Sequence, residues 1–74
     1  MPKISPLKPH EVVRKLRQVG FEGPISGGRH QRMVRTKTGQ VIPIPMHKGK
    51  DVSVGVIRAI IREIGLTPEE WNEL

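Results

Sequence analysis

The chain has 74 residues, with thirteen lysines and arginines against seven aspartates and glutamates, a formal net charge of +6 and a pI near 10.6. This length predicts one domain with a small core. The absence of cysteine excludes disulfides and thiolate metal sites, and no apolar run approaches the roughly 18 residues that span a membrane. We therefore expect a soluble, cytoplasmic protein whose basic balance favours a polyanionic partner, nucleic acid before an acidic protein.

The first predicted helix begins at Pro9, because proline suits the first helical position, and runs through PHEVVRKLRQV. Its apolar residues recur on one side, at Val12, Val13, Leu16 and Val19. Gly20 is placed to end the helix in a left-handed conformation, with Phe21 folding back onto the last turn. Residues 1–8 are expected to form a short arm. The residues of the other helix face, which we expect to be exposed to solvent, are Arg14, Lys15 and Arg17.

Three short extended segments are predicted next. Glycine and proline interrupt FEGPISGG, so this segment holds at most a short strand around residues 24–26. HQRMVRTKTGQVIPIPMH predicts a β-hairpin around TKTG, where Gly39 supplies a positive φ. Alternation places Ile42, Ile44 and Met46 on the core face. Two prolines in the same arm cannot donate to a ladder, which indicates an edge strand.

A basic loop, HKGKD, leads to a second helix that Ser53 is expected to cap. Gly65 ends this helix. Residues 66–74 predict a short C-terminal helical turn, in which Thr67 and Glu70 form a capping box. The apolar stripe of the second helix consists of Val54, Ile57, Ile60, Ile61 and Ile64.

The order of elements is therefore helix, two or three antiparallel strands, helix. Because each helix has a single apolar stripe, both are expected to pack on one face of the sheet, which gives an α+β two-layer fold. The other face of the sheet is expected to be polar and basic.

Four segments resemble, in this order, the HicA toxin (YcfA-like) family: VVRKLRQVGF, GGRH, GQVIPIPMHKGK and IRAIIREIGLTPEEW. The resemblance implies a single HicA-like domain over residues 1–74 with a double-stranded-RNA-binding-domain-like fold, α-β-β-β-α. It also implies the toxin of a type II toxin–antitoxin system, a metal-independent endoribonuclease (mRNA interferase) silenced by a cognate HicB-type antitoxin. The catalytic residue that it implies is His30.

One feature of GGRH differs from the usual pattern of the family, which has the histidine directly after the glycine or serine step. Here Arg29 stands between Gly28 and His30. Because side chains alternate along a strand, a shift of one residue would move His30 to the other face of the sheet. Both placements of His30 remain open from the sequence.

The chemistry of RNA cleavage suits this segment. Without a metal, the 2′-hydroxyl of RNA can attack the adjacent phosphorus if a base removes its proton, and histidine is the side chain best suited to that role near neutral pH. Arg29 and Arg32 can grip phosphate oxygens. Gly28 allows the backbone to approach a ligand closely, and Gln31 completes the candidate RNA contacts of the segment.

His47 is the second histidine candidate, as leaving-group acid or phosphate contact, and the alternative for it is an ordinary loop histidine. Lys48 and Lys50 are expected to help bind RNA, unless they are only a solvated basic loop. Met33 and Met46 have core spacing, and we assign them to packing. With no cysteine, a single aspartate and no helical two-histidine motif, we expect neither a metal nor a cofactor.

Two other functions remain open. The chain could be a non-catalytic RNA-binding module of the same fold, in which His30 is an idle residue at the start of a strand. It could instead be a basic docking protein for an acidic partner. With one tryptophan, one phenylalanine and no tyrosine, an aromatic platform for stacking bases is excluded, so RNA binding would depend on phosphates, backbone and shape.

Overall fold

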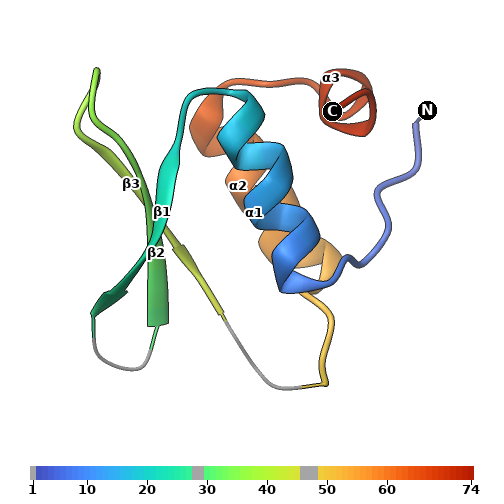
Figure 1. The fold of residues 1–74 in the computed structure, drawn as a ribbon. Helices are drawn as coiled ribbons and strands as arrows, with labels where there is room; N and C mark the ends of the chain where they lie inside the picture. Colours follow the sequence, from blue (N-terminus) through green and yellow to red (C-terminus); the bar gives the residue numbers. More distant parts are fainter. Residues whose placement is uncertain (1, 28–29, 46–48) are drawn as a thin grey trace.

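The computed structural model describes residues 2–27, 30–45 and 49–74, and it has the expected two layers, a sheet covered on one face by helices (Figure 1). The strands form an antiparallel sheet in the order β1-β2-β3. The predicted α+β arrangement, similar to that of a double-stranded-RNA-binding domain, is confirmed. The elements are α1 Pro9–Gln18, β1 Glu22–Gly27, β2 His30–Arg35, β3 Gln40–Ile44, α2 Val54–Ile64 and α3 Pro68–Asn72.

The ends of α1 follow local rules of sequence. Pro9 occupies the start of the helix. Beyond its end, Gly20 has a φ of 94°, in the left-handed region that favours glycine. The N–H of Phe21 donates to the carbonyl oxygen of Leu16 at 3.1 Å, and the Phe21 side chain is buried. The predicted fold-back of Phe21 onto the last turn is confirmed.

The hairpin of β2 and β3 is regular along its whole length. Met33 pairs with Ile42, and both side chains are buried. The turn closes through the N–H of Gly39, which donates to the carbonyl oxygen of Arg35 at 2.8 Å with a φ of 73° at the glycine. Ile44 is buried as predicted, whereas Met46 lies outside the described residues. The expected edge position of β3 is confirmed.

Strand β1 is longer than predicted, because it spans Glu22–Gly27 rather than residues 24–26 alone. The pairing with β2 shifts between Glu22 and Ile25, so the glycine and proline between them sit in an irregularity rather than ending the strand. Gly23 has a φ of 127°, and a Cβ there would lie 2.8 Å from the carbonyl oxygen of Arg32. The irregularity therefore requires glycine at this position.

The C-terminal helices are capped as predicted. The N–H of Val56 donates to Oγ of Ser53 at 3.3 Å, and Gly65 ends α2 with a φ of 76°. In α3, the N–H of Glu70 donates to Oγ1 of Thr67 at 3.1 Å, and the N–H of Thr67 donates to Oε1 of Glu70 at 2.8 Å. None of the helices in the described part of the chain has the length and apolar character to cross a bilayer.

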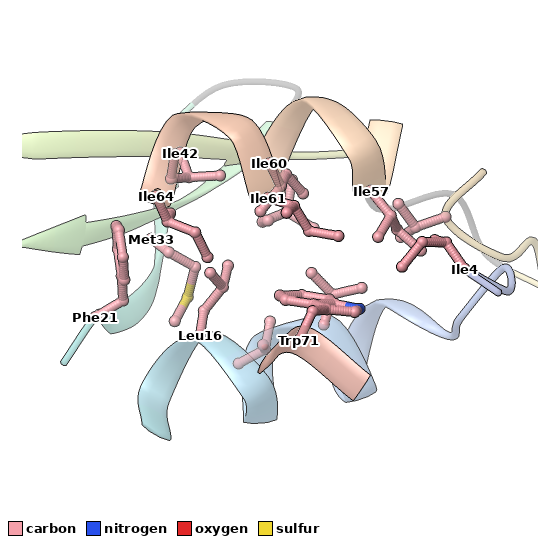
Figure 2. Close-up of a cluster of buried hydrophobic side chains, with 14 residues drawn as sticks. Ile4, Leu16, Phe21, Met33, Ile42, Ile57, Ile60, Ile61, Ile64 and Trp71 are labelled. Atoms are coloured by element: carbon pink, nitrogen blue, oxygen red, sulfur yellow. The ribbon is translucent and has the colours of Figure 1, made fainter. Parts of the chain in front are cut away.

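The core lies between the sheet and the helices, and Trp71 reaches into it from α3, between α1 and α2 (Figure 2). The N-terminal arm also contributes, because Ile4 is buried. Leu7 and Val52 exchange main-chain hydrogen bonds of 3.3 and 2.6 Å, which ties the arm to the segment before α2. The other buried members of the cluster are Val12, Val13, Leu16, Phe21, Met33, Ile42, Ile44, Val52, Ile57, Ile60, Ile61 and Ile64.

Lys15 corrects the prediction of a fully solvated outer face on α1, since only 7% of the residue is exposed. Its Nζ donates to the carbonyl oxygen of Trp71 at 2.8 Å and to the main-chain oxygen of Leu74 at 3.2 Å. It also lies 5.3 Å from the centre of the Trp71 ring. The physical reason is that α3 packs against α1, and the last carbonyl oxygens of α3 need a donor.

Burial lowers the pKa of Lys15 from 10.5, and the neighbouring Arg14 lowers it further. In the window between this lowered pKa and 10.5, the unfolded chain holds a proton that the folded protein has released, so a rise in pH favours folding. We expect the unfolding free energy of the wild type, minus that of Lys15→Met, to rise with pH in that window. Denaturant titrations at several pH values measure this difference, and a flat difference up to pH 10.5 would contradict the assignment.

Candidate functional site

Two segments that the sequence singled out, GGRHQR and PMHKGK, leave the sheet at the same end. Gly27, the last residue of β1, pairs with His30, the first residue of β2, and Ile44, the last residue of β3, pairs with Gln31. Figure 1 shows the end of β1, the start of β2 and the end of β3 at this one end of the sheet. The predicted site residues that lie outside the described part of the chain are Gly28, Arg29, His47 and Lys48.

The register of β2 bears on the placement of His30 that the sequence left open. Successive residues of a strand alternate between the two faces of a sheet. Met33 is buried against the helices, and position 30 lies three residues before it, so position 30 belongs to the same register set as Arg32 and Val34. The pairing of β2 with β3 is continuous from Gln31 to Arg35, without a bulge. Position 30 therefore shares a register set with Arg32.

The structure separates two residues that the sequence grouped as RNA contacts. Arg32 is exposed and pairs across the sheet with Ile25 on one side and Pro43 on the other. Gln31 belongs to the alternate set of Met33 and is partly buried. Lys50, in the loop before α2, is exposed. Arg32 and Lys50 are thus the described candidates whose side chains are fully available to a ligand.

The uncovered face of the sheet is less polar than expected. Ile25 is 46% exposed and Val41 is 45% exposed, and Pro43 is exposed beside them. These residues surround Arg32, so the prediction of a wholly polar and basic face is wrong. The reason is that β1 and β3 carry apolar residues at positions of both alternate sets, whereas only one set meets the helices.

The starts of α1 and α2 lie close together in the helical layer, because main-chain bonds join Leu7 and Val52 (Figure 1). This layer covers the face of the sheet opposite the exposed Arg32. Lys8 lies 3.4 Å from the carboxylate of Asp51, so this acid is paired with a cation.

Two arginines have a structural role that the sequence did not reveal. Nε and Nη2 of Arg17 donate to the carbonyl oxygen of Gly23 at 3.1 and 2.7 Å. Nη2 of Arg35 donates to the carbonyl oxygen of Val19 at 3.0 Å, and its guanidinium lies 4.6 Å from the centre of the Phe21 ring. These contacts hold the end of α1 against β1 and β2, and no local sequence signal distinguishes the two arginines from the exposed ones.

A site built on a metal finds no support in the described residues, where no three histidine, cysteine, aspartate or glutamate side chains gather. His10 lies on the first turn of α1, exposed, with its Nε2 3.7 Å from the carboxylate of Glu11. It is remote in sequence from the other histidines, and it has no place in the candidate site.

Comparison with known proteins identifies one family. Residues 9–66 match the family model described as HicA toxin of bacterial toxin–antitoxin. The match runs from the start of α1 beyond the end of α2, and it includes both loops at the candidate site. Among curated proteins, none matches the chain.

The two arginines of β2 provide a matched test, because Arg35 is expected to stabilise the fold whereas Arg32 is exposed and free to bind a ligand. Arg35→Met removes the hydrogen bond to Val19 and the contact with Phe21, and we expect it to lower the unfolding free energy by about 1–3 kcal/mol. Arg32→Met changes an exposed side chain on the same strand and should stay within about 0.5 kcal/mol of the wild type. Urea denaturation measures both. Equal destabilisation by the two variants would contradict the division of roles.

Proposed function

Since this chain belongs to the HicA toxin family, with the match over residues 9–66, we propose that it is a metal-independent endoribonuclease that cleaves mRNA with His30 as the general base. Family membership makes the chain the toxin of a toxin–antitoxin system and supports nuclease activity in general terms. It also implies a cognate antitoxin. The proposal adds the substrate, the reaction and the residues.

The observation that carries the proposal is the arrangement at one end of the sheet. His30 begins β2 in the same register set as the exposed Arg32, and β3 ends beside the start of β2, from where the chain continues through Lys50 to α2. A general base must lie within reach of groups that hold the phosphate. The register and the shared end of the two loops support such a site, and the odd spacing of His30 from the buried Met33 is what the proposal depends on.

The reaction that we propose is an internal transesterification. His30 removes the proton of the 2′-hydroxyl, the 2′-oxygen forms a bond to the adjacent phosphorus, and the bond from phosphorus to the 5′-oxygen breaks. His47, or water in its place, gives the leaving 5′-oxygen its proton. The products are a 2′,3′-cyclic phosphate and a free 5′-hydroxyl, so no oxidant, metal or cofactor takes part. Each positioned acid or base contributes about 100- to 10,000-fold.

Cations and main chain bind the phosphate in this proposal. Arg32 can donate two hydrogen bonds to phosphate oxygens, and Lys50 adds positive charge. Arg29 and Lys48, which lie outside the described residues, are proposed as further phosphate contacts, and Gly28 as a position where the backbone can approach RNA closely. Gln31, on the other register set, contacts RNA only from the edge of the site. Cytoplasmic mRNA is the substrate, and a HicB-type antitoxin covers His30 to silence the toxin.

The first test of this function is cleavage of a labelled mRNA in EDTA. The wild type should cleave and leave 2′,3′-cyclic phosphate ends. His30→Ala should lose at least about 100-fold in rate, because it removes the base. His10→Ala is the matched control, since this histidine is exposed on α1, and its rate should equal that of the wild type.

The pattern across variants separates the alternatives. RNA binding without cleavage by any folded variant would favour the non-catalytic binding module. Equal cleavage by the wild type and His30→Ala would contradict the role of His30, and His47→Ala would then identify whether the other loop carries the base. Cleavage that stops in EDTA would contradict the metal-independent reaction.

A second test concerns the phosphate contact of Arg32. On single-stranded RNA, each phosphate neutralised by a cation contributes a slope of roughly −0.7 to the logarithm of affinity against the logarithm of salt. We expect that adding Arg32→Met to the non-cleaving His30→Ala variant weakens RNA binding. The salt dependence should become shallower by roughly the slope of one phosphate. Fluorescence anisotropy across salt concentrations measures both. An unchanged slope would show that Arg32 makes no phosphate contact.

A further inference from the structure

A groove runs between the edge strand β3 and helix α2, on a part of the molecule distinct from the loops of the proposed catalytic site. Its volume is about 310 Å³, which is at the lower end of ligand-binding pockets. One wall comes from Ile42 and Pro43 of β3. The lining residues from α2 are Gly55, Val56, Ala59, Ile60 and Glu63. The small residues among them leave the groove open, and all but Glu63 are non-polar.

The free edge of β3 runs along this groove. Among the residues that the structure describes, β3 pairs only with β2. A Cβ built at Gly23 would lie 2.8 Å from the carbonyl oxygen of Arg32, which shows that the main-chain groups of Arg32 face β1. Because the N–H and C=O of one strand residue point to the same side, the pair of Arg32 with Pro43 is not hydrogen-bonded.

It follows that Val41 and Pro43 direct their main-chain groups to the free edge. Val41 offers one N–H and one C=O, while Pro43 offers a C=O and has no N–H to leave unsatisfied. Gln40 fixes one end of this edge to α2, since its Nε2 donates to the carbonyl oxygen of Glu63. The edge can therefore accept an added strand in a restricted register.

The charge at the groove is mixed, because the lining residue Glu63 is acidic whereas two arginines of α2 stand beside the groove wall. Arg58 and Arg62 follow Gly55 and Ala59 of the groove wall by three residues, a spacing that makes them neighbours on the helix surface. Both arginines are exposed. A segment that placed apolar side chains in the groove could reach these two cations with carboxylates. The chain as a whole, at a net charge of +6, also favours an acidic partner.

We propose that an extended, acidic and apolar segment of the cognate antitoxin adds to the edge of β3 and seats its apolar side chains in the groove between β3 and α2. The inference rests on the antitoxin implied by family membership and not on the role of His30. It assigns antitoxin binding to a surface beyond the catalytic loops. Disruption of the groove should therefore release the toxin from control while leaving its cleavage of RNA intact.

The test is calorimetric titration of the purified chain with the antitoxin encoded beside it. Ala59→Arg places a long charged side chain in the groove, and we expect binding to weaken at least about 30-fold, as for a residue at the centre of an interface. Gln18→Arg is the matched control, because it adds the same side chain at an exposed position of α1, and its affinity should stay within about twofold of the wild type. Arg62→Glu should weaken binding most at low salt.

Hydrogen exchange supplies a readout independent of these substitutions. The amide of Val41 should exchange more slowly in the complex than in the free protein, because it gains an acceptor from the added strand. Unchanged exchange at Val41, or undiminished affinity of Ala59→Arg, would overturn the proposal. A free wild type that dimerises, with Ala59→Arg monomeric, would overturn it in favour of a second copy as the occupant.

RNA cleavage by the free variants keeps this test separate from the test of the proposed function. Ala59→Arg that cleaves RNA like the wild type is folded, so its loss of antitoxin binding would support the groove. A wild type that binds the antitoxin through the groove without cleaving RNA would support the docking proposal and contradict the nuclease. RNA cleavage by the wild type, together with antitoxin binding that Ala59→Arg does not weaken, would support the nuclease and contradict the docking proposal.

Discussion

The pairing of Met33 with Ile42 determines how the rest of the sheet is used. Both side chains are buried beneath the helices, so a shift of either strand by one residue would expose one of them and bury a neighbour. This constraint assigns Arg32 to the uncovered face and position 30 to the same register set. Burial in the core thus fixes the register of residues that lie outside it, and the proposed catalytic arrangement depends on that register.

Some arginines of this small basic protein stabilise the fold, whereas others are exposed and free to bind a ligand. Arg17 and Arg35 donate to main-chain oxygens of Gly23 and Val19, and they hold the end of α1 against the strands. Arg32 lies on the uncovered face and is exposed. The count of thirteen lysines and arginines therefore overstates the cations that are free to meet an anion. In a chain with a small core, such contacts to main chain replace part of the stabilisation that burial supplies in larger domains.

The two proposed binding regions make different demands on the fold. The proposed cleavage needs the end of the sheet where β2 begins, beside the exposed Arg32. Antitoxin docking needs the edge of β3 and its groove with α2, where apolar walls favour a protein segment. Pro43 serves the second region because it lacks a donor at the free edge. In these proposals substrate and antitoxin share the surface around His30, whereas the groove serves the antitoxin alone.

The sequence by itself determined the features that depend on neighbouring residues. The starts of helices at Pro9, Ser53 and Thr67, and their ends at Gly20 and Gly65, follow from proline geometry, side-chain caps and left-handed glycines. The hairpin turn and the apolar stripes of the helices also depend on residues close together in the sequence. Together with the family resemblance, they predicted the fold.

Only the tertiary structure decided the features that join distant segments. Lys15 is buried because α3 returns to it from the other end of the chain, and β1 continues past its glycine and proline because β2 pairs with it. The register set of His30 and the groove beside β3 were likewise undecided, since each depends on which residues are packed together. Which face of the sheet a residue occupies depends on the register of its strand, and the register is set only when the sheet has formed.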